Sequence, residues 1–190
     1  MSDAFGHVTQ HMALHIVTMN VAAPLAALFL RNIQIRPLDM LAGWLAPAAV
    51  FQLALLWLMH VPAVFEQISR SPAISATTHV ALLASAFVFW REVIRLAPTS
   101  PWRPIGALLI TGKIVCLLGV LLLFAGRPLY ALPHAQGPEL SGLADQQLAG
   151  LLMLIGCPLT YVFGATIVAS RWLLRMDRPD LAPRTGTGAA

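Results

Sequence analysis

The strongest constraint on this chain is a series of five apolar runs, each about as long as a lipid bilayer is thick. They are roughly His11–Leu30, Leu41–His60, Ala73–Trp90, Ile105–Ala125 and Leu148–Leu174. Soluble domains usually carry about 25% charged residues, whereas only 11% of these 190 residues are charged and 58% are hydrophobic. We therefore predict an all-α integral membrane helical bundle of about five transmembrane helices, forming a single domain over residues 1–176.

Proline and glycine separate the apolar runs, because these residues do not continue a helix. The predicted loops after the second, third and fourth runs are Val61–Pro72, Pro98–Pro104 and Gly126–Asp145. Pro24, Pro47 and Pro158 lie inside the runs and predict kinks, which membrane helices tolerate. Residues 177–190 are polar and contain proline and glycine, so we expect a disordered cytoplasmic tail.

Arginine counting predicts the orientation of the bundle. With five spans, one side of the membrane receives Arg31, Arg36, Arg91, Arg95, Arg103, Arg171, Arg175, Arg178 and Arg184. The other side receives only Arg70 and Arg127. Because positive residues favour the cytoplasmic side, the N-terminus is predicted outside and the C-terminus inside a bacterial inner membrane.

Composition also argues against other classes of protein. Cys116 and Cys157 both lie within apolar runs, so no disulfide framework is indicated. No signal peptide is expected, because no basic segment precedes an apolar run with a small-residue cleavage site. The formal charge of +4 comes from residues at the ends of apolar runs. We therefore expect membrane lipid, and not nucleic acid, as a partner.

All six histidines fall at or near the predicted outer face: His7, His11, His15, His60, His79 and His134. The first three are spaced four residues apart, which places them on one face of a helix, about 6 Å apart along its axis. Two imidazoles at that spacing can share a metal ion. An ionisable side chain inside the membrane usually faces the bundle interior and has a partner there. His15 and His79 lie deep enough for this argument.

Other candidate ligands lie at the same membrane level. Met12, Met59 and Met153 offer thioethers, which together with imidazole favour copper, especially Cu(I). Methionine also fills gaps between helices without any such role. Asp145 is expected to begin the fifth helix from the outer side and is suited to capping a helix N-terminus, to binding a metal, or to orienting a histidine. Gly150 predicts a close approach between two helices.

Four motifs resemble those of the CtaG-type cytochrome c oxidase assembly factors. They are His11-Met12-Ala13-Leu14-His15 followed by Ala23-Pro24-Leu25, Trp57-Leu58-Met59-His60-Val61-Pro62, His79 followed by Phe89-Trp90, and Asp145-Gln146-Gln147-Leu148-Ala149-Gly150. They occur in the family's order and extend from His11 to about Met153. Many members have about seven helices, with extra ones before the first motif, so this chain resembles a short member.

The resemblance implies an inner-membrane protein, not itself an enzyme, that handles or delivers copper to a respiratory oxidase. Its partners would be cytochrome c oxidase subunits or other copper chaperones. The implied metal-site residues are His11, His15, His60, His79 and Asp145, to which the residues themselves add Met12. The sequence leaves open whether the site forms within one chain or across a homo-oligomer.

Three other functions are consistent with the same residues. Two histidines on facing helices can ligate haem from both sides, which would make the protein a membrane electron carrier. A metal-dependent membrane enzyme would need a metal-bound water and a general base, for which Asp145 or Glu66 is available. A structural membrane subunit would use its histidines only for packing.

Overall fold

A broken helix forms the first membrane span. In the computed structural model, which describes residues 6–33, 43–130 and 142–177, this span consists of α1 (His7–Val17), the π-helical turn η1 (Thr18–Ala22) and α2 (Ala23–Phe29). Pro24 has no N–H to donate, and the wider turn directly before it accommodates this loss. The indole Nε1–H of Trp90 donates to the Met19 carbonyl inside that turn, at 3.1 Å. The irregularity expected at Pro24 is therefore a π-helical turn.

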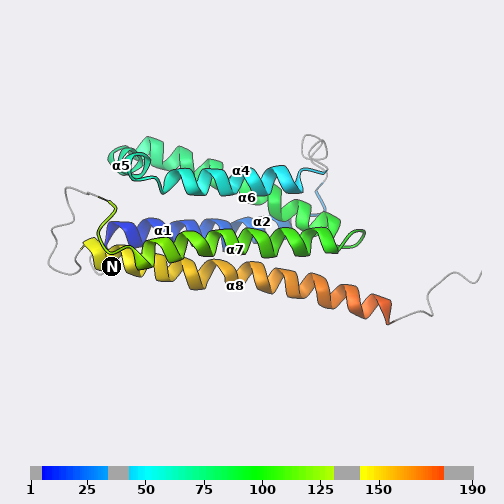
Figure 1. Ribbon diagram of the computed structural model, residues 1–190. Helices are drawn as coiled ribbons and strands as arrows, with labels where there is room; N and C mark the ends of the chain where they lie inside the picture. Colours follow the sequence, from blue (N-terminus) through cyan, green and yellow to red (C-terminus); the bar gives the residue numbers. More distant parts are fainter. Residues whose placement is uncertain (1–5, 34–42, 131–141, 178–190) are drawn as a thin grey trace, which may run out of the picture.

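Five further helices complete the described part of the chain (Figure 1). They are α4 (Leu45–Met59), α5 (Pro62–Arg70), α6 (Pro72–Leu96), α7 (Trp102–Phe124) and α8 (Gly142–Met176). The first span, α6, α7 and α8 are each long and apolar enough to cross a membrane, and α4 with α5 gives up to a fifth span. The described residues contain no strand, so the all-α membrane bundle of the sequence analysis is confirmed.

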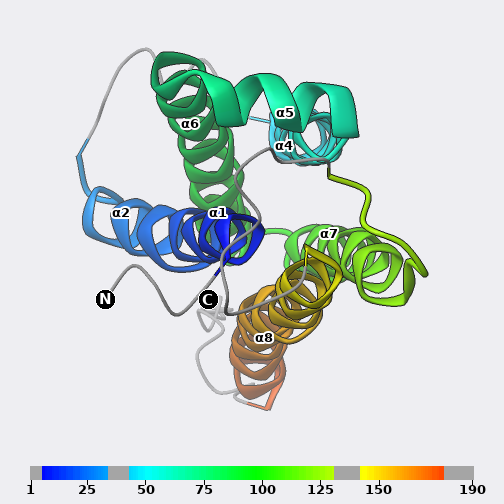
Figure 2. The ribbon, with the colours of Figure 1, turned by 90° about the vertical axis from the view of Figure 1, so that its left-hand side faces the viewer.

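The predicted loop between the second and third spans is wrong, because most of it is the helix α5. The chain turns by 80° between α4 and α5. Val61 is extended (φ −64°, ψ 126°), as favoured before a proline, and Pro62 occupies the first turn of the new helix. Phe65 and Ile68 face the core, while Glu66 and Arg70 form an exposed ion pair. Figure 2 shows α5 lying across the ends of α4 and α6.

Glycines bring α7 and α8 into close contact. A Cβ placed on Gly150 would lie 2.7 Å from the Leu123 nitrogen and 2.8 Å from the Gly119 oxygen. A Cβ on Gly119 would likewise meet the Gly150 oxygen at 3.0 Å. Neither position has room for a side chain, so the close approach predicted at Gly150 is confirmed. Small residues of this kind allow membrane helices to pack backbone to backbone.

The two ends of the bundle differ in composition. The start of α1, the end of α4 and the starts of α6 and α8 lie together at one end, which we call the histidine end (Figures 1 and 2). The end of α2, the end of α6, the start of α7 and the end of α8 lie at the opposite end. We call it the arginine end, for Arg31, Arg95, Arg103, Arg171 and Arg175. His134 and most of the predicted tail, residues 178–190, lie outside the described residues.

Candidate metal centre

Helix α1 supplies two histidines to the interior of the histidine end. His11 and His15 are one turn apart and are 8% and 2% exposed. Their Nε2 atoms lie 2.9 Å apart, and their rings meet edge to face. At most one proton fits between two nitrogens at that distance, so at least one of them directs a lone pair toward the other.

His60 ends helix α4 and points back into the same interior. Its Nδ1–H donates to the Leu56 carbonyl at 2.6 Å, which leaves Nε2 as the lone-pair nitrogen. That Nε2 lies 3.0 Å from the Sδ atom of Met12, which is completely buried. A thioether and an unprotonated imidazole nitrogen are both acceptors, so neither can donate a hydrogen bond to the other.

His79 comes from the second turn of α6. Its Nδ1–H donates to the Ser75 carbonyl at 2.7 Å, so its Nε2 is also a lone-pair nitrogen. This Nε2 is buried and has no hydrogen-bond partner among the described residues. The Ser75 carbonyl thus fixes the tautomer and the orientation of the His79 ring, as carbonyl groups behind histidine ligands do at metal sites.

The four imidazoles converge from three helices. One ligand nitrogen each from His11, His15 and His79 lies within 4.8 Å of the others. The ring of His15 stacks on His79 at 4.8 Å and lies 5.6 Å from the ring of His60. We call His11, Met12, His15, His60 and His79 the histidine cluster. The buried Nδ1 of His15 also lacks a hydrogen-bond partner among the described residues.

Aromatic side chains cover the cluster on the side of α5. Phe65 is fully buried and meets the ring of His11 edge to face at 5.0 Å. Phe65 also contacts Tyr130, at 4.2 Å, whose hydroxyl donates to the His60 carbonyl at 3.2 Å. Burial raises the pKa of Tyr130, so this hydroxyl stays protonated and remains a donor. The sequence analysis did not identify Phe65 or Tyr130, because it assigned both residues to loops.

Asp145 lies near the cluster but has a different set of partners. Its carboxylate accepts hydrogen bonds from the backbone N–H groups of Val8 (2.9 Å) and Thr9 (3.1 Å) and from the Thr9 hydroxyl. The first N–H groups of a helix have no partner within it, and a negative charge there also interacts favourably with the helix dipole. Asp145, at the start of α8, therefore caps α1 and not its own helix.

The neighbourhood of Asp145 is tightly packed. A Cβ on Gly6 would lie 2.1 Å from the carboxyl carbon of Asp145, so only glycine fits at that position. Gln146 is also buried and accepts from the Leu129 N–H at 2.7 Å, while its own amide donates to the Leu122 carbonyl at 3.2 Å. The Asp145-Gln146 pair thus ties the starts of α1 and α8 to the end of α7.

The remaining candidates make none of the ring or ligand contacts that join the histidine cluster within the described residues, or lie outside those residues. His7 is exposed, and its ring lies 6.3 Å from that of Phe65. Both cysteines are free thiols, Cys157 buried and Cys116 partly so. Met59 and Met153 are buried in the apolar core.

Comparison with known protein families matches residues 2–175 to the cytochrome c oxidase caa3 assembly factor, CtaG. The chain belongs to the CtaG family. The match covers nearly the whole chain and includes every residue of the histidine cluster, and it confirms the resemblance drawn from the four motifs. No curated protein and no solved structure matches the chain. This CtaG protein is therefore a multi-pass membrane protein of an oxidase assembly family.

Proposed function

We propose that this CtaG protein holds Cu(I) in the histidine cluster and passes it to a copper centre of cytochrome c oxidase. The observation that carries the proposal is the convergence of His11, His15 and His79 in a buried site where one ring nitrogen of His15 and one of His79 have no hydrogen-bond partner among the described residues. Buried polar atoms normally have hydrogen-bond partners. Atoms without one are accounted for when their partner is a metal ion.

The donor set fits copper as the cargo. A metal ion about 2.0 Å from each of three imidazole nitrogens holds those nitrogens about 3.5 Å apart. One ligand nitrogen each of His11, His15 and His79 lies within 4.8 Å of the others, so small side-chain rotations bring them to that spacing. The Met12 thioether beside His60 adds a soft ligand, which favours Cu(I) over harder divalent ions.

The proposed role of Asp145 is positional. Its carboxylate is already occupied by Val8 and Thr9, so it fixes the start of α1 and with it the height of His11 and His15. Of the roles that the sequence analysis considered for Asp145, this one is the helix cap, placed on α1.

Orientation and partner follow from the same proposal. The arginine count places the histidine end outside, where copper and the extracytoplasmic part of an oxidase meet. The cargo leaves unchanged, so the protein acts as a copper chaperone and not as an enzyme.

Bis-histidine haem is the less suitable alternative, because His15 and His79 stack face to face. Haem ligation needs their nitrogens to face each other across the macrocycle.

Anaerobic titration of the full chain in mild detergent tests this proposal. With Cu(I) and a competing chromophoric chelator, we expect one tightly held ion per chain and nitrogen and sulfur ligands in its X-ray absorption spectrum. A Soret band in the purified protein would instead establish haem. If no copper is taken up against the chelator, the cluster is not a copper site.

A cellular measurement tests delivery separately from binding. We expect the His79→Ala variant to insert in the membrane normally but to leave the oxidase deficient in copper. Added copper should restore oxidase activity in part, because the defect is one of supply. Normal oxidase copper content in cells that carry only this variant would contradict the proposed delivery role.

A further inference from the structure

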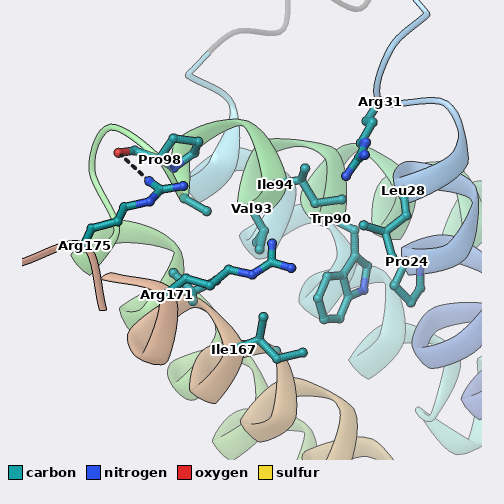
Figure 3. A pocket seen from close by; sticks show the side chains of 13 residues that line it. Pro24, Leu28, Arg31, Trp90, Val93, Ile94, Pro98, Ile167, Arg171 and Arg175 are labelled. Carbon is teal, nitrogen blue, oxygen red and sulfur yellow. Dashed lines mark hydrogen bonds between the residues drawn. The ribbon is translucent and has the colours of Figure 1, made fainter. Parts of the chain in front are cut away.

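The arginine end contains a cavity of about 290 Å³ between α2, α6 and α8 (Figure 3). Its walls are mostly apolar and include Leu28 of α2, Trp90 and Val93 of α6, and Gly164 and Ile167 of α8. Leu28 is 46% exposed and Ile167 is 37% exposed, so the cavity is open beside them. Both residues belong to membrane-spanning helices, and the opening therefore faces lipid.

The cavity exists because the helices separate toward this end. In Figure 1 the far end of α8 diverges from the other helices. Trp90 covers the inner side of the space, since its ring stacks on Tyr161 at 5.7 Å. A Cβ on Gly164 would lie 3.1 Å from that indole, so glycine is what allows the ring to lie against α8.

Three guanidinium groups surround this apolar space. Arg31, Arg171 and Arg175 belong to its lining, and no carboxylate does. Figure 3 shows the Arg171 side chain extending between Ile167 and Val93 toward Trp90. Arg175 donates to the Pro98 carbonyl at 3.4 Å. Within the described ranges, neither Arg31 nor Arg171 has an ion-pair partner, so their charges are available to an anion.

We propose that this cavity binds an anionic phospholipid, with the phosphate between the arginines and one acyl chain along the apolar wall. Guanidinium groups suit phosphate because they donate two parallel hydrogen bonds. Basic pockets between membrane helices are known to hold anionic lipid headgroups. A free phosphate would use the arginines but not the apolar wall. The volume lies near the lower limit of about 300 Å³ for ligand pockets, which suits part of one chain.

Native mass spectrometry of the full chain in mild detergent tests the proposal. The probes are dioleoyl phosphatidylglycerol, dioleoyl phosphatidylcholine and inorganic phosphate. We expect phosphatidylglycerol to bind at concentrations about 25-fold below those needed for phosphatidylcholine, because Arg31 and Arg171 each contribute about fivefold near an anionic headgroup. Equal binding of the two lipids would overturn the proposal.

Two variants and a matched control distinguish the contribution of the arginine charges to lipid binding from that of the apolar cavity. Arg31→Gln with Arg171→Gln should abolish the preference for phosphatidylglycerol. Arg103→Gln, an exposed arginine at the same end but outside the cavity lining, should change it less than twofold. Leu28→Trp fills the opening without changing the charge and should weaken both lipids severalfold. Melting temperatures establish that each variant folds.

Two results from these variants would contradict the proposed lipid site. An equal loss in Arg103→Gln would mean nonspecific attraction to a basic surface. Inorganic phosphate that binds as tightly as phosphatidylglycerol, and does so unchanged in Leu28→Trp, would identify a free-anion site. Neither outcome bears on copper, since the cavity shares no residue with the histidine cluster.

Discussion

The histidine end and the arginine end use ionisable side chains in opposite ways. The imidazoles of the histidine cluster are at most 9% exposed, and backbone carbonyls fix two of them. At the arginine end the guanidinium groups of Arg31 and Arg171 are exposed around an open cavity. Buried lone pairs suit a small cation, and exposed guanidinium groups suit an anion that is itself partly in lipid. Under the two proposals, the same bundle thus offers two different kinds of binding site.

The largest expected effect that tests this contrast is that of His15→Ala. His15 contacts His11, His60 and His79, so its loss removes the central member of the cluster. We expect Cu(I) affinity to fall about a hundredfold or more, above the range for groups that only orient a ligand. Chelator competition measures this change. Glutamine is closer to histidine in size than alanine is. If His15→Gln loses as much Cu(I) affinity as His15→Ala, a packing defect is not the cause of the loss.

Asp145→Asn should have the next largest effect. The substitution removes the negative charge at the start of α1. It also places an amide NH₂ group, which cannot accept a hydrogen bond, opposite one of the two backbone N–H groups. We expect the free energy of unfolding to fall by about 1–3 kcal/mol, with Cu(I) affinity about tenfold lower. Thermal melting in detergent and chelator competition measure the two changes. Unchanged stability would contradict the capping role.

Glu92→Gln tests the comparison from the arginine end. Glu92 is 1% exposed and accepts from Arg95 through both oxygens at 2.7 Å and from the Gly43 N–H at 2.9 Å. We expect a loss of about 1–2 kcal/mol in unfolding free energy, reduced by solvent screening because Arg95 is half-exposed. Cu(I) affinity should not change. A copper defect in this variant would mean that the two ends are not independent.

His7→Ala should have the smallest effect. His7 continues the four-residue spacing of His11 and His15 but is exposed. We expect less than a twofold change in Cu(I) affinity in the same competition assay. This variant also serves as the matched control for His15→Ala. A large loss would show that the cluster extends onto the surface of the bundle.

The fold was predictable because apolar length and proline position report directly on membrane spans. The part that was missed, α5, is polar on one side and begins with Pro62, so the sequence resembles a loop. Its helical form depends on Phe65 and Ile68 packing onto the core, which no local pattern reveals. Likewise, Pro24 indicated an irregularity but not that it would be a π-helical turn.

The convergence of the candidate histidines was predictable from the sequence, whereas their supporting contacts were not. The spacing of His11 and His15 indicated a shared face, and the orientation placed His60 and His79 at a matching depth. The cap that Asp145 places on α1 joins residues 137 positions apart. An aspartate at a helix start predicts a cap for that helix, so the sequence alone pointed to α8. The covering rings of Phe65 and Tyr130 depend in the same way on tertiary contacts.

The long separation between Val8 and Asp145 has a consequence for biogenesis. The first span leaves the ribosome well before Asp145 is synthesised, so α1 must remain uncapped until α8 has entered the membrane. A stalled or truncated chain would carry all four cluster histidines yet lack the contact that sets their height. Under the proposed function, metal loading is thus restricted to chains whose insertion is complete.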